Sequence, residues 1–155
     1  IQPDGLSENG YLNAMYPYLF LYIGAFLRIC RVSLGLSYKM VVFLANLGSA
    51  LCAYYAFKSI SKSRRTVILG VVLYTLMPYR FTNIFSRGDL GETLALTFWP
   101  LVIVGIYHIL FGDRKKWYFL VLGFSGILQS HILSVMFVRG FCVISAVMFI
   151  GNIWR

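Results

Sequence analysis

Residues 93–111 read TLALTFWPLVIVGIYHILF, a stretch without Asp, Glu, Lys or Arg that is mostly apolar. A helix of roughly 20 such residues crosses about 30 Å of hydrocarbon. Similar uncharged runs cover residues 40–57 and 117–138, and shorter ones cover 66–79 and 140–154. The sequence therefore predicts an all-α, polytopic transmembrane bundle with four or five spanning helices.

The composition supports the same class. Hydrophobic residues make up 59% of the chain and charged residues 12%, with a mean hydropathy of +0.76, which excludes an ordinary soluble domain. The chain begins at Ile1 and stops at Trp154-Arg155, where an apolar segment ends, so we expect a fragment of a longer protein. Its first ten residues are polar and lack the pattern of a signal peptide.

The charge distribution predicts a topology. The net charge is +9, and basic residues cluster in two short segments, residues 58–65 and 113–116. The positive-inside rule places both on the cytoplasmic side, and the two helices between them agree in parity. The segment 80–92 and the connection around Arg139 then lie on the outer side.

The region 11–31 has two interpretations. It contains several tyrosines, Pro17, Arg28 and Arg31, and aromatic side chains favour the headgroup boundary. An interfacial or re-entrant helix therefore competes with a crossing helix. We favour the interfacial helix because it keeps both arginines, and Lys39, outside. The chain would then be one membrane domain, with an outer loop and juxtamembrane helices over 1–39 and transmembrane helices over 40–155.

The segment 78–92 places two arginines and two carboxylates between apolar stretches. Asp89 and Glu92 have the spacing of a capping box, which predicts a helix beginning near residue 90. The free N–H groups and positive dipole end of that helix suit a phosphate or carboxylate. Arg80 and Arg87 would stand beside it as a phosphate clamp. The simpler alternative is a helix cap with two arginines that snorkel to lipid headgroups.

Two histidines lie within the apolar runs. His131 would lie toward the outer end of a helix over 117–138 and would need a hydrogen-bonding partner. It could carry a proton, contact a phosphate or bond to a neighbouring helix. His108 is close to the basic segment 113–116, so we expect it at the interface.

The sequence contains no motif for several other kinds of chemistry. Cys30, Cys52 and Cys142 are far apart and set in apolar sequence, which predicts packing residues rather than disulfides or a metal site. The chain lacks a P-loop, a G-x-G-x-x-G fingerprint, an H-E-x-x-H helix and a G-x-S-x-G elbow. Its basic residues flank apolar helices, so we expect membrane lipids as partners and no nucleic acid.

Several short motifs follow one another along the chain: Asn9-Gly10-Tyr11, Tyr16-Pro17-Tyr18, Gly35-Leu-Ser-Tyr-Lys39, Met77-Pro78-Tyr79-Arg80, Arg87-Gly-Asp-Leu-Gly-Glu92, Trp99-Pro100-Leu101 and Ser130-His131. In this order they resemble the bacterial membrane proteins of the 6-pyruvoyl-tetrahydropterin synthase related family. Despite that name, these proteins are polytopic and resemble GT-C glycosyltransferases, with YfhO-like proteins as near relatives. The resemblance covers nearly the whole chain.

The resemblance implies sugar transfer from a polyprenyl-phosphate donor on the outer face of a bacterial cytoplasmic membrane. Arg80 and Arg87 would contact the donor phosphate, Glu92 would hold an arginine or a metal, and His131 would line the cavity. Tyr79 and Asp89 complete the expected substrate-binding set. Asp4 and Glu8 would fall at the end of the first outer loop, as candidates for the catalytic base. No cofactor follows from these residues.

Two other functions use the same residues. A transporter or flippase for an anionic lipid or solute would bind its cargo at a broken helix near Pro78. A non-catalytic membrane subunit would need the arginines for assembly alone.

Overall fold

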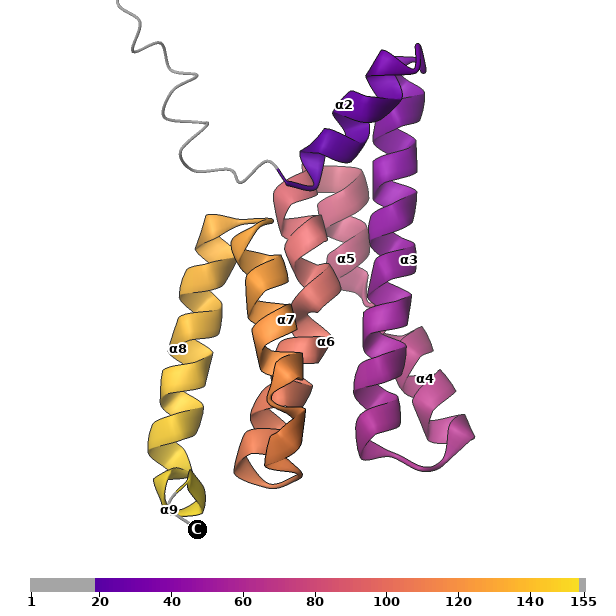
Figure 1. Cartoon of the computed structure of the whole chain (residues 1–155). Helices are drawn as coiled ribbons and strands as arrows, with labels where there is room; N and C mark the ends of the chain where they lie inside the picture. Colours follow the sequence, from indigo (N-terminus) through magenta and orange to yellow (C-terminus); the bar gives the residue numbers. More distant parts are fainter. Residues whose placement is uncertain (1–18, 154–155) are drawn as a thin grey trace, which may run out of the picture.

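The computed structural model describes residues 19–153, and all regular elements in that part of the chain are helices (Figure 1). In chain order they are α2 (Leu21–Ile29), α3 (Leu34–Ile60), α4 (Arg64–Thr75), α5 (Pro78–Phe81), the π-helix η1 (Thr82–Arg87), α6 (Leu90–Leu110), the 3₁₀ helix η2 (Arg114–Lys116), α7 (Tyr118–Leu128), α8 (Ile132–Met148) and α9 (Ile150–Ile153).

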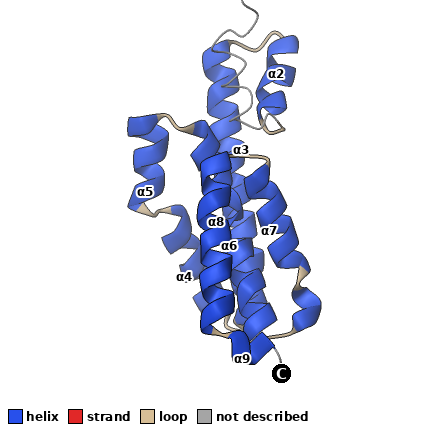
Figure 2. Cartoon of the chain, turned by 90° about the vertical axis from the view of Figure 1, so that its left-hand side faces the viewer, coloured by secondary structure: helices blue, strands red, loops and turns tan. Residues whose placement is uncertain are grey.

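Helix α6 is the centre of the bundle and packs against both α3 and α7 (Figures 1 and 2). Its contact with α7 is close because glycines meet the facing backbone. A Cβ atom at Gly105 would lie 2.3 Å from the Leu120 nitrogen, and one at Gly123 would lie 2.7 Å from the Val102 nitrogen. Side chains from α6, α7 and α8 form the adjoining core: Ala95, Val102, Ile127, Val135 and Val138.

Three helices are long and apolar enough to cross a membrane: Leu34–Ile60, Arg64–Arg87 and Leu90–Leu110. They confirm the predicted membrane helices over 40–57 and 93–111. The expected run over 66–79 gains its length from the following turns, which continue to Arg87. Ile132–Met148 is a shorter apolar helix, and spans beyond the three remain a prediction.

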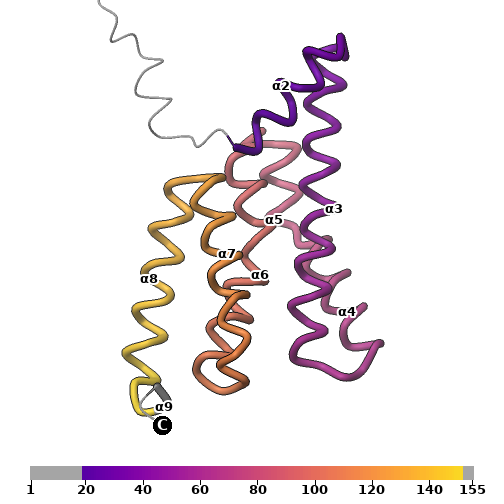
Figure 3. Tube along the Cα trace, in the orientation of Figure 1, coloured from indigo at the N-terminus to yellow at the C-terminus, as the bar shows by residue number. Residues whose placement is uncertain are grey.

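The prediction of one helix over 117–138 is wrong. Helix α7 ends at Leu128, and α8 begins at Ile132 and runs back alongside α7 (Figure 3). The polar residues between them allow the turn, since Ser130 Oγ donates to the Gly126 carbonyl at 2.6 Å and His131 adopts an extended backbone. Arg139 consequently lies inside α8 rather than in a connection.

The described part of the region 11–31, residues 19–31, contains no helix long enough to cross a membrane. Helix α2 has nine residues, which span about 14 Å, far less than a bilayer core. The chain then reverses at Arg31, which has a φ of 62°, and Ser33 caps α3 by accepting from the Leu36 amide. This short helix packs on α3, which agrees with the interfacial alternative.

The connections gather at the two ends of the bundle. The α3–α4 and α6–α7 connections, which hold the basic segments, lie at one end, and the η1–α6 junction and the α7–α8 turn lie at the other (Figures 1 and 3). The two basic segments therefore lie at the same end of the bundle. Which end faces the cytoplasm remains a prediction.

Candidate functional site

The start of α6 is capped by Asp89, as the sequence predicts. Its Oδ1 accepts a hydrogen bond from the Glu92 amide at 2.9 Å. The second half of the predicted capping box is absent, because the Asp89 amide donates to the Asn83 carbonyl at 3.2 Å instead. Glu92 is thus free of the cap, and its carboxylate turns toward Arg87 and Tyr79.

Arg87 is the centre of a surface cluster with Tyr79, Asn83, Asp89 and Glu92, here called the Arg87 cluster. Its Nη1 donates to Glu92 Oε2 and to Asn83 Oδ1, each at 2.9 Å, and its Nη2 lies 3.8 Å from Asp89 Oδ2. The Tyr79 hydroxyl donates to the second oxygen of Glu92. One cation and two carboxylates leave a formal charge of −1, which disfavours a phosphate at this position.

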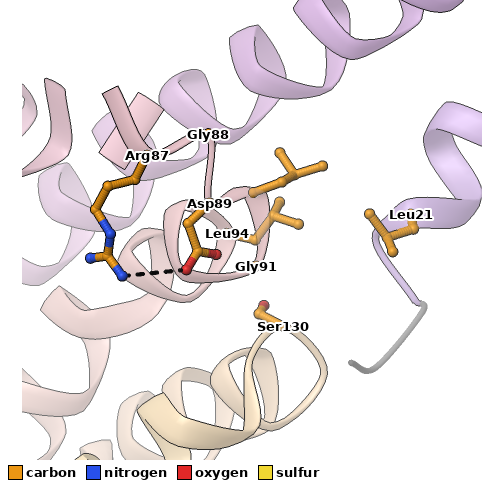
Figure 4. A pocket seen from close by; sticks show the side chains of 8 residues that line it. Leu21, Arg87, Gly88, Asp89, Gly91, Leu94 and Ser130 are labelled. Atoms are coloured by element: carbon orange, nitrogen blue, oxygen red, sulfur yellow. Dashed lines mark ion pairs between the residues drawn. The ribbon is translucent and has the colours of Figure 1, made fainter. Parts of the chain in front are cut away.

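A pocket of about 360 Å³ lies beside Arg87, here called the Arg87 pocket (Figure 4). Its walls come from α2, the start of α6 and the α7–α8 turn, and include Leu21, Arg87, Asp89, Gly91, Leu94 and Ser130. The Asp89 carboxylate stands in this wall and holds Arg87 (Figure 4). The predicted helix end is therefore present, but a carboxylate already occupies it.

Arg80 has entirely different surroundings. It is 1% exposed and lies against α3, where its Nη2 donates to Ser49 Oγ at 2.8 Å and to Asn46 Oδ1 at 3.1 Å. Its guanidinium carbon is 5.5 Å from the centroid of the Tyr74 ring. Within residues 19–153, its Nε and Nη1 have no hydrogen-bond partner and no carboxylate pairs with it.

A buried cation without a carboxylate needs a counter-charge. Arg80 belongs to a candidate membrane-spanning segment, and its partner Ser49 lies near the middle of α3. An arginine at the centre of a membrane helix costs roughly 2.5–3.5 kcal/mol on insertion scales. Neutral partners such as Asn46 and Ser49 offset only part of that cost, so the position favours an anion that the described chain does not supply.

Arg80 lines a groove of about 630 Å³ between α3 and the α4–η1 segment, here called the Arg80 groove. Its lining includes Tyr38, Lys39, Asn46, Leu76, Arg80 and Phe85. Lys39 and Arg80 both line this groove, no acidic residue of the described chain does, and most of its wall is apolar. The helical segment is interrupted at Leu76–Met77, just before Pro78, where it borders the groove.

The remaining predicted site residues do not gather at one site. His131 is buried at the end of the bundle that holds Asp89, and its Nδ1 is 3.0 Å from Ser134 Oγ. It is the N-cap residue of α8, immediately before Ile132, rather than a residue inside a longer helix. His108 is also buried, 3.0 Å from Ser59 Oγ. Asp4 and Glu8 lie outside the described residues.

The partners of Arg80 were missed by the sequence-based prediction. Asn46 and Ser49 are polar residues within the uncharged run 40–57, three positions apart and so on one helix face. Lys39 belongs to α3, which begins at Leu34 rather than at residue 40 as expected. A polar pair on one face of an otherwise apolar helix, opposite an arginine of another apolar segment, is the signal that could have found the groove.

The chain matches no protein-family model, no curated protein and no solved structure. The resemblance to GT-C-like membrane proteins therefore remains a prediction from motifs.

Proposed function

We propose that the protein is an integral membrane protein that binds the phosphate group of a lipid in the Arg80 groove. The observation that carries this proposal is a buried guanidinium in which two nitrogen atoms have no hydrogen-bond acceptor and which has no carboxylate partner in residues 19–153. Arginine offers its donors in a planar fork that matches phosphate oxygens. Both nitrogens are enclosed, so a phosphate would reach them when the Arg80 side chain turns toward the groove, and it would then supply both the missing charge and the missing acceptors.

The walls of the groove favour a lipid over a soluble anion. Phe81, Ile84 and Phe85 line it together with Val42 and Leu76. Phe85 is 77% exposed, so its ring is available to an apolar chain in the bilayer. A phosphate beside an apolar wall is the chemistry of a lipid headgroup and its tail.

Glycosyl transfer from a polyprenyl-phosphate sugar remains our proposal for the activity, and it rests on the resemblance. In this proposal Arg80 holds the donor phosphate on the outer face of a bacterial cytoplasmic membrane, and Asp4 or Glu8 is the candidate base. Tyr79, Arg87, Asp89 and Glu92 then serve to hold the η1–α6 junction. His131 shares the end of the bundle with this junction.

Transport of an anionic lipid is the second candidate, and one specific observation favours it. The segment Arg64–Arg87 is interrupted at Leu76–Met77, where it lines the groove. Discontinuous membrane helices commonly form the binding sites of transporters. Movement of a fluorescent phospholipid between the leaflets of proteoliposomes would favour transport over transfer.

The test compares the two arginines in the same assay. Binding of a polyprenyl phosphate to the purified protein is titrated for wild type, Arg80→Gln and Arg87→Gln at equal folded yield. A charged hydrogen bond contributes about 1.5–3 kcal/mol, so Arg80→Gln should weaken binding about tenfold to a hundredfold. Arg87→Gln should bind as wild type does. Equal weakening in both variants, or no weakening in Arg80→Gln, would contradict the proposal.

A further inference from the structure

We infer that the Arg80 groove selects a phosphate headgroup with two negative charges, a phosphomonoester or diphosphate, over a phosphodiester with one. This inference rests on the proposed lipid-binding function and concerns the charge of the headgroup. A polyprenyl-phosphate sugar is itself a phosphodiester, so the inference favours a diphosphate-linked donor, or the released polyprenyl phosphate, as the tightest ligand. Its basis is the second cation of the groove, Lys39, which sequence analysis placed in the outer region and which no predicted function uses.

Lys39 and Arg80 face the same groove from different elements. Lys39 belongs to α3 and lies two helical turns before Asn46, the residue that bonds to Arg80. Tyr38, Lys39, Val42 and Asn46 of α3 all border the groove. The two cations therefore lie at different levels of the bundle. Lys39 is exposed near the start of α3, and Arg80, from α5, is buried against the middle of α3.

Residues 19–153 do not balance the charges of the groove. No ion pair involves Lys39 or Arg80 in the part of the chain that the structure describes. The five acidic residues of the sequence are Asp4, Glu8, Asp89, Glu92 and Asp113, and none of the last three lines the groove. Asp89 and Glu92 pair with Arg87 instead, so the groove carries two positive charges and an apolar wall.

A phosphodiester cancels one of these charges, whereas a phosphomonoester carries a charge of about −1.5 to −2 near neutral pH. The second negative charge interacts favourably with the second cation, since opposite charges near a low-dielectric surface attract more strongly than in water. Arg80 should therefore determine whether a lipid phosphate binds, and Lys39 should determine how much the monoester is preferred.

The experiment uses two lipids with the same acyl chains, phosphatidic acid as the monoester and phosphatidylglycerol as the diester. Native mass spectrometry of the purified protein would give the affinity of each. Wild type should bind phosphatidic acid roughly tenfold more tightly, and Lys39→Gln should reduce this preference to about twofold with little change for phosphatidylglycerol. Lys62→Gln removes the same charge from the opposite end of the bundle and should keep the wild-type preference.

The outcomes separate the two proposals. Equal binding of both lipids in wild type, lost in Arg80→Gln, would overturn the selectivity and leave the lipid site in place. A preference that survives in Lys39→Gln, or that disappears equally in Lys62→Gln, would also overturn it. Absence of binding to either lipid would overturn the proposed function itself.

Discussion

Arg80 and Arg87 belong to the same helical segment, yet the protein treats them in opposite ways. Arg87 is half exposed and pairs with two carboxylates. Arg80 is buried, and its partners within residues 19–153 are the neutral side chains Asn46, Ser49 and Tyr74. In the described part of the chain, the arginine that water could have solvated has two counter-charges, and the buried arginine has none. Arg87 therefore fits a structural role, and Arg80 fits a binding role.

The largest expected effect comes from removing the buried charge. Arg80→Met should raise the free energy of unfolding in lipid-free detergent by about 1–2 kcal/mol, because the cost of an unpaired membrane cation exceeds the hydrogen bonds lost. Reversible unfolding in SDS would measure this change. Arg87→Met is the matched control and should lower the free energy of unfolding by less than about 1 kcal/mol, as expected for an exposed ion pair.

A lower stability for Arg80→Met than for Arg87→Met would reverse the comparison. It would mean that Arg80 is bonded for the sake of the fold, as in a non-catalytic membrane subunit.

A smaller effect distinguishes capping from charge in the Arg87 cluster. Asp89→Ala removes the side chain that accepts from the Glu92 amide and should destabilise the protein by about 1 kcal/mol. Asp89→Asn keeps a capping oxygen and should lower the free energy of unfolding by only a few tenths of a kcal/mol. The same unfolding measurement would check both variants, and an equal loss in both would show that the contact with Arg87, rather than the cap, stabilises this junction.

The membrane helices could be predicted from the sequence because a long uncharged run has few alternatives in a bilayer. The predicted runs over 40–57 and 93–111 correspond to α3 and α6, and Asp89 caps α6 as predicted. The prediction of one helix over 117–138 was wrong for a physical reason. A turn between apolar helices needs only local hydrogen bonds, here from Ser130 to Gly126, and no charge or proline marks it.

The candidate site was predicted only in part because an arginine does not reveal its partners in the sequence. Arg80 and Arg87 resembled a pair, since both flank the expected start of α6. Their separation depends on α3, a distant helix whose Asn46 and Ser49 reach Arg80. The five residues of the Arg87 cluster all lie in one segment, from Tyr79 to Glu92, so their contacts are local in the sequence. The contacts of Arg80 cross the bundle and leave no such local pattern.

The most direct test of a missing counter-charge is to supply one. Asn46 Oδ1 already accepts from Arg80 at 3.1 Å, so Asn46→Asp would give Arg80 the kind of partner that Arg87 has. Binding of polyprenyl phosphate by purified Asn46→Asp would be compared with Asn46→Ala, which removes the amide without adding charge. The account predicts at least about a tenfold loss for Asn46→Asp and a much smaller loss for Asn46→Ala. Wild-type affinity in Asn46→Asp would contradict it.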